Sequence, residues 1–159
     1  MLCLCSPKSP VVAELGHAVL LRADTQREGV HHDLQEALEA FNHVQFDGHL
    51  DGVRVAWSAP EPTMAVLGLC WDSSRPVVLH VGMDAASVPQ YVVHSVLFHE
   101  LCHLVVPSED YCDGTLEHHP RAFWLMHERY PHHTRAEQWL AKNQTRLRNR
   151  MRRICGTVK

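Results

Sequence analysis

The segment from Ser87 to Pro107 is mostly apolar, with the runs YVVHSVLF and LCHLVV, yet it carries a charged carboxylate, Glu100. Its first four residues, SVPQ, have the pattern of a capping box with proline in the first turn, where a missing N–H costs little. Pro107 ends the helix because proline cannot continue it. The sequence therefore predicts a buried helix that ends near Val106. Burying a carboxylate is costly, so packing alone does not explain Glu100.

The same helix contains the motif H-E-x-x-H, formed by His99, Glu100 and His103. Residues four apart are rotated by about 400°, so the two imidazoles lie about 40° apart on one face and about 6 Å apart along the axis. Two nitrogens at about 2.0–2.1 Å can therefore share one zinc ion. Glu100 is rotated by about 100° from His99, so we expect it to reach a water molecule at the metal rather than to bind the ion.

Catalytic zinc sites usually have three protein ligands and one open position, so a third ligand must come from elsewhere in the chain. His118 and His119 lie where the chain returns from the long helix and the next helix begins. Adjacent side chains at a helix start point in different directions, so we expect only one of them to bind, and we favour His119. Pro120 fixes the backbone there, and Phe123 and Trp124 are expected to anchor the next helix in the core.

The elements around this helix predict an α+β fold. Asp33 opens an earlier helix through a capping box, and Asp47-Gly48 ends it. Three strands follow, and their short connections favour antiparallel neighbours, because a parallel crossover needs a dozen or more residues. The predicted strands are Val53–Trp57, Met64–Trp71 and Pro76–Val81. After a loop over 107–118, the predicted helices are Pro120–Tyr130 and about Thr134–Ile154.

The N-terminal residues and the cysteines bear on location. The start, MLCLCSPKSP, has no apolar core long enough for a signal peptide, and no run approaches the roughly 18 apolar residues of a membrane span. The six cysteines form no C-x-x-C pair, which argues against a zinc ribbon and favours free thiols in a reducing compartment. We therefore predict a cytoplasmic protein without a membrane segment. Residues 1–29 are expected to be partly disordered, with a short helix over 10–22.

Charge is unevenly distributed along the chain. Residues 141–159 contain seven basic side chains and no acidic one, whereas the other 140 residues contain 8 basic and 18 acidic ones, a balance of −10. This pattern predicts either a polyanionic partner, DNA or RNA, or a contact with the acidic body. The alternative is a docking helix with a solvated basic face, because apolar residues follow one stripe. These are Leu140, Leu147, Met151 and Ile154.

The residues FHELCHL and HPRAFW, in which fifteen residues separate His103 from His119, resemble the SprT-like (Spartan-type) zinc metallopeptidases. FNHVQFDGHLDGVRVAWS at 41–58 is similar to the opening helix, Phe-Asp-Gly turn and first strand of that family, and VLGLCWDSSRPVVLHV to its next two strands. HHPRAFWLMHERYP also resembles the related YgjP-like metal-dependent hydrolases, in which the third histidine follows the motif more closely. The resemblance covers residues 30–140 as one domain and leaves 141–159 as a basic helical extension.

This resemblance implies a minimal zincin fold, with a small antiparallel sheet packed on helices that include the H-E-x-x-H helix. It also implies one catalytic zinc ion bound by His99, His103 and His119. The implied activity is hydrolysis of protein or peptide substrates, with Glu100 as the general base that activates a water molecule at the zinc.

Two features leave alternatives open. The only cysteine after residue 112 is Cys155, so the additional zinc module of many Spartan relatives is missing, and a DNA-linked role does not follow from the resemblance. The alternatives are a zinc-containing DNA-associated protein and a hydrolase that acts on a non-peptide amide.

Peptide hydrolysis also needs an oxyanion donor. The sequence does not separate the candidates Tyr111, His127 and Tyr130.

Overall fold

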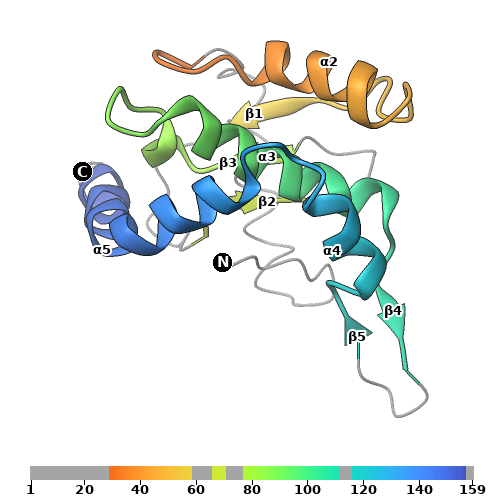
Figure 1. Cartoon of the computed structure of the whole chain (residues 1–159). Coiled ribbons are helices and arrows are strands. Elements are labelled where there is room, and N and C mark those ends of the chain that lie inside the picture. Colours follow the sequence, from red (N-terminus) through yellow and green to blue (C-terminus); the bar gives the residue numbers. More distant parts are fainter. Residues whose placement is uncertain (1–28, 59–65, 71–76, 112–115, 157–159) are drawn as a thin grey trace.

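The computed structural model describes residues 29–58, 66–70, 77–111 and 116–156, and these form an α+β fold, as predicted (Figure 1). The predicted helix over 10–22 lies outside the described residues. In chain order the elements are α2 (Leu34–Gln45), β1 (Val55–Trp57), β2 (Gly68–Leu69), β3 (Val77–Leu79), the 3-10 helix η1 (Val81–Met83), α3 (Gln90–Val105), β4 (Glu109–Asp110), β5 (Leu116–Glu117), α4 (Arg121–His127) and α5 (His133–Gly156).

The three-stranded sheet is mixed, so the prediction of an antiparallel sheet was wrong. The strand order is β1-β3-β2. β3 pairs in parallel with β1, with Val77 opposite Val55, and antiparallel with β2, with Val78 opposite Leu69. The prediction considered only links between consecutive strands. β1 and β3 are joined by the whole segment 58–76, which is long enough for a parallel connection. β2 is therefore an edge strand of this sheet.

A second pairing occurs inside the segment predicted as a loop. β4 and β5 form a short antiparallel ribbon, with Glu109 opposite Glu117. Its strands are only two residues long, and three of their four residues are acidic, so the sequence pattern contains no strand signal. Figure 1 shows this ribbon extending beyond the C-terminal end of α3 and leading back to α4.

α2 begins and ends as its sequence predicts. The Asp33 carboxylate accepts hydrogen bonds from the backbone N–H groups of Gln35 and Glu36, at 2.8 and 3.0 Å. After the helix, Asp47 and Gly48 adopt positive φ angles of 48° and 79°. Glycine reaches this region without a Cβ penalty, so the turn signal ends the helix at this point.

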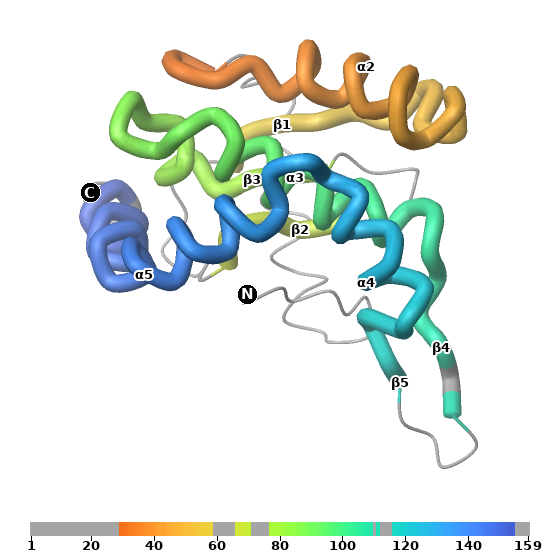
Figure 2. The backbone as a smooth tube through the Cα atoms, viewed as in Figure 1, coloured from red at the N-terminus to blue at the C-terminus, as the bar shows by residue number. Residues whose placement is uncertain are grey.

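α3 is the central element of the fold. It contacts α2, α4 and α5 and the strands β2 and β3, and Figure 2 shows its path between them. Every residue from Ser95 to Cys102 is buried, as expected of a helix that is apolar all round. The helix ends at Val105, before Pro107, as predicted. The predicted capping box was wrong: Pro89 is the N-cap and supplies no side-chain hydrogen bond, so Ser87 lies outside the helix.

α5 packs against the rest of the protein through its apolar stripe, as expected of the docking helix that the sequence analysis gave as one alternative. Leu147 and Met151 are buried, and the Arg150 Nε donates a hydrogen bond of 2.9 Å to the Gly82 carbonyl in η1. The predicted domain boundary after residue 140 falls inside this helix. Among the described helices, none combines the length and apolar character that a membrane crossing requires.

Candidate metal centre

Three histidines from two parts of the chain meet at the C-terminal half of α3. His99 and His103 lie one turn apart on that helix, and His119 comes from the segment between β5 and α4. One nitrogen from each ring lies within 4.8 Å of the other two. The Nε2 atoms of His99 and His119 are 3.2 Å apart. The three histidines that the sequence analysis chose as candidate ligands thus lie together in the structure.

The spacing of these nitrogens fits a shared metal ion. Ligands at 2.0–2.1 Å in tetrahedral geometry lie about 3.3 Å from one another, close to the separation of the His99 and His119 nitrogens. All three donors are imidazoles, which suit zinc, copper, iron or nickel better than magnesium or calcium. The cluster could thus hold a transition-metal ion.

The local structure selects His119 over His118. The β4–β5 ribbon turns the chain back toward α3, and the Glu117 carboxylate accepts a 2.9 Å hydrogen bond from the backbone N–H of His119. The His118 ring turns the other way, with Nδ1 3.3 Å from the Ser108 hydroxyl. Of the two, His119, which the sequence analysis favoured, is the one that joins the cluster.

Phe123 supports all three imidazoles. Its ring centroid lies 4.9, 4.4 and 4.6 Å from those of His99, His103 and His119, and the side chain is fully buried. The prediction that Phe123 anchors α4 is confirmed.

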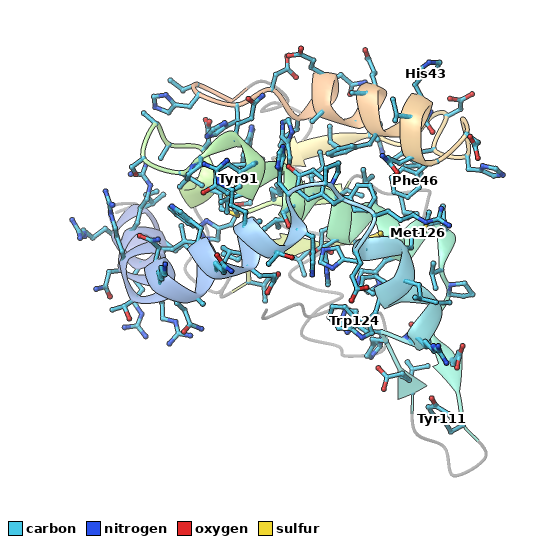
Figure 3. The ribbon with its side chains drawn as sticks, in the orientation of Figure 1. His43, Phe46, Tyr91, Tyr111, Trp124 and Met126 are labelled. Atoms are coloured by element: carbon cyan, nitrogen blue, oxygen red, sulfur yellow. The ribbon has the colours of Figure 1, made fainter. Side chains whose placement is uncertain are left out.

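The same prediction was wrong for Trp124. This side chain is 42% exposed and lies against His119, with ring centroids 5.3 Å apart. Figure 3 shows it on α4, near the segment that leads from β5 to this helix. Because Phe123 and Trp124 are adjacent on a helix, only one of them can face the core.

Burial keeps the three imidazoles neutral. Desolvation is the largest effect on each of them, and neighbouring histidines add to it. The pKa of His99 is lowered to about 2 and that of His103 to about 3, and the pKa of His119 is also lowered. A neutral imidazole offers a lone pair to a metal, whereas a protonated one does not. All three rings are therefore in the binding form at neutral pH.

Glu100 is the only buried acidic side chain among the described residues, with 1% of its surface exposed. Burial raises its pKa to about 8. A divalent cation at the adjacent histidines would favour the charged form and lower that pKa again. A bound cation would therefore decide whether the Glu100 carboxyl group is charged, and able to accept a proton, near neutral pH.

Gly68, on the edge strand β2, closes over Glu100. A Cβ atom at this position would lie 2.7 Å from both Cγ and Oε1 of Glu100. Real Cβ contacts are never this close, so any larger residue would move the carboxylate. Sequence analysis missed this contact, because only the placement of β2 against α3 brings the two residues together.

The three oxyanion candidates lie in different surroundings. His127 is fully buried and packs against His99, with ring centroids 4.9 Å apart. The Tyr130 hydroxyl donates a 3.0 Å hydrogen bond to the Tyr91 carbonyl. Tyr111 is 51% exposed and lies on the ribbon that carries β4 (Figure 3). Of the three, only His127 contacts a ligand histidine, and it does so from the interior.

The centre thus joins three neutral imidazoles to a buried carboxyl group on the residue after the first of them. Such a set can hold a Lewis-acidic ion and place a proton acceptor beside it. No protein-family model, curated protein or solved structure matches this chain.

Proposed function

We propose that this chain is a zinc-dependent metallopeptidase of the SprT-like type. His99, His103 and His119 hold the ion, and Glu100 is the general base. One observation carries the proposal: three imidazoles lie close enough together to share one ion, and the residue that follows His99 on the same helix is a buried glutamate.

The ligand set favours zinc with an open coordination position. Three protein ligands are usual in catalytic zinc sites, whereas structural zinc sites have four. No fourth histidine, cysteine or carboxylate joins the cluster among the described residues. The vacant position is where a substrate carbonyl or a water molecule would bind.

The residues of the site have definite roles in the proposed reaction. A bound zinc ion would lower the pKa of a water molecule and polarise the scissile carbonyl. Glu100 would accept the water proton and then deliver it to the leaving amine. Phe123 and the interior His127 would hold the ligand rings in place and keep water from their inner side.

The substrate would lie along β2. This strand is at the edge of the three-stranded sheet, and its Gly68 touches Glu100. An extended peptide added to that edge would form backbone hydrogen bonds and pass beside the carboxylate. Trp124 would supply an apolar contact for a substrate side chain next to His119.

The cytoplasmic location, which rests on the cysteine pattern, belongs to the same proposal.

Substituting Gly68 with alanine tests the contact with Glu100. Its φ angle is outside the left-handed region, so the backbone accepts alanine, but the new Cβ would displace the carboxylate. Because a misplacement of about 1 Å can cost a factor of 10², we expect kcat to fall by about 10²-fold with zinc content unchanged. Steady-state kinetics and metal analysis measure both quantities.

Gly82→Ala is the matched control for this substitution. Gly82 is also buried, and a Cβ there would lie 2.9 Å from Met151 and 3.0 Å from His80, neither of which belongs to the histidine cluster. It therefore reports the general cost of crowding a buried glycine. Equal losses of kcat in the two variants would contradict a specific role for Gly68.

The proposal itself is tested by incubating the purified chain with an unfolded protein substrate. We expect cleavage to stop after a chelator removes the metal and to return on addition of one equivalent of zinc. The metal should also stabilise the fold, since it binds the native state preferentially. Cleavage that persists without metal would contradict the proposal. A protein that binds zinc but leaves peptide bonds intact, with or without DNA, would point to one of the two alternative functions.

A further inference from the structure

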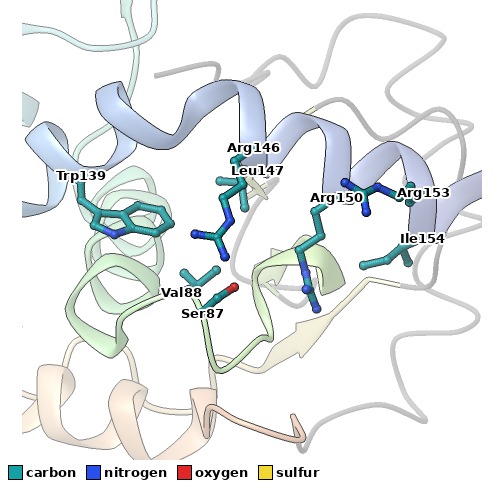
Figure 4. Close-up of a pocket in the computed structure, with 8 residues that line it drawn as sticks. All are labelled: Ser87, Val88, Trp139, Arg146, Leu147, Arg150, Arg153 and Ile154. Atoms are coloured by element: carbon teal, nitrogen blue, oxygen red, sulfur yellow. The ribbon is translucent and has the colours of Figure 1, made fainter.

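A second candidate site lies at the opposite end of α3 from the histidines. A cavity of about 340 Å³ opens between α5 and the segment that leads into α3 (Figure 4). Three arginines of α5, the indole of Trp139 and the Ser87 hydroxyl line it. The rise of a helix places the start of α3 about 14 Å from His99, so this cavity is separate from the metal centre.

The arginines recur along one face of α5. Arg146, Arg150 and Arg153 are spaced by four and three residues, which brings them to the same side of the helix. They flank the buried stripe of Leu147 and Met151; Arg150 is half-buried, and Arg146 and Arg153 are exposed at the rim of the cavity. Figure 4 shows the guanidinium groups of Arg146 and Arg150 directed toward the segment that contains Ser87.

The guanidinium groups of Arg146 and Arg150 have N–H donors that the described structure does not use. Arg150 uses its Nε to bind the Gly82 carbonyl, which leaves its two terminal nitrogens for another acceptor. Within the described part of the chain, no carboxylate pairs with Arg146 or Arg150, and none of the residues that line the cavity is acidic. The Pro89 N-cap of α3 supplies no side-chain acceptor, so the positive end of that helix dipole adds to the field.

The cavity also has an apolar side. Trp139, Val88 and Ile154 line it beside the arginines. Guanidinium groups match phosphate oxygens bidentately, and a planar indole is a stacking surface for a base. The volume is at the lower end of the range for small-molecule sites. A multiply charged anion that carries a flat ring satisfies both sides of the cavity.

We propose that this cavity binds a nucleoside phosphate, with the phosphates on Arg146 and Arg150 and the base against Trp139. The ligand is either a free nucleotide or the terminal nucleotide of a strand, since both present the same groups. The inference does not depend on the peptidase activity.

Calorimetric titration of the full chain with ADP tests the site. Loss of a charge-assisted hydrogen bond is typically worth a factor of 10 or more, so Arg146→Ala should weaken ADP binding by at least about 10-fold. This variant breaks no hydrogen bond of the described structure, which guards against misfolding. Arg148→Ala is the matched control, because Arg148 is exposed on the opposite side of α5 and carries the same charge. It should change the affinity by less than about 3-fold.

Two further measurements sharpen the result. Trp139→Leu should weaken binding of ADP more than binding of inorganic pyrophosphate, since only ADP carries a base. A 5′-phosphorylated single-stranded oligonucleotide that displaces ADP would identify a strand end as the ligand, and failure to displace it would identify a free nucleotide. Equal losses for Arg146→Ala and Arg148→Ala would show only general attraction to a basic helix and would overturn the proposal. Absence of ADP binding to the unmodified chain would also overturn it.

Discussion

Glu100→Gln is expected to reduce cleavage of an unfolded protein substrate by about 10²–10⁴-fold, the contribution of a general base. Glutamine has nearly the same shape but cannot accept the proton of an attacking water molecule. The fold should tolerate the change, because burial already raises the pKa of Glu100 to about 8 and so disfavours its charged form in the metal-free protein. Zinc content should stay at one ion per chain, since Glu100 is not part of the ligand set.

Glu128→Gln is the control for this experiment. Glu128 lies at the end of α4 and is exposed, so the same chemical change there should leave turnover unaltered. Metal content, thermal unfolding and turnover of both variants separate loss of the base from loss of the metal or the fold. Full activity in Glu100→Gln, with its zinc intact, would remove Glu100 from the proposed mechanism.

His119→Ala is expected to weaken zinc binding by more than about 100-fold. Loss of a partner that only orients a ligand costs about 10–100-fold, and removal of a ligand must cost more. His118→Ala should change zinc affinity by no more than about 3-fold, because the His118 ring is turned toward Ser108. Competition with a chromophoric chelator measures both affinities under the same conditions.

The comparison between these two variants is sharper than either alone. The two histidines are adjacent, have the same chemistry, and lie in the same short segment before α4. Any general disturbance of that segment should affect both variants. A greater loss of affinity in His118→Ala than in His119→Ala would reassign the third ligand and contradict the geometry of the centre.

The histidine cluster could be predicted because its geometry is mostly local. The spacing of His99 and His103 is fixed by the helical repeat, and the apolar run around them ensures that the helix forms. The choice between His118 and His119 could only be favoured, since it depends on the direction in which the β4–β5 ribbon returns. The hydrogen bond from the His119 N–H to Glu117 shows how that direction is fixed.

The contacts that surround the ligands were not predictable from spacing. Strand order depends on pairing between distant segments: β2 and β3 pair antiparallel as expected of consecutive strands, but β1 pairs with β3 instead of β2. The same long-range pairing places Gly68 over Glu100. At α4 the sequence offered two adjacent aromatic residues, and the packing of Phe123 against three imidazoles decided which one is buried. Long-range packing therefore carries the information that local patterns lack.

Metal analysis of the purified chain together with zinc X-ray absorption is the most direct test of the metal centre. The proposed site predicts one zinc ion per chain, surrounded by three imidazole nitrogens and one oxygen at about 2.0–2.1 Å, with no sulfur. Removal of His119 should reduce the imidazole count to two. A sulfur ligand at about 2.3 Å, or a chain that retains no transition metal, would contradict the convergence of His99, His103 and His119 on one ion.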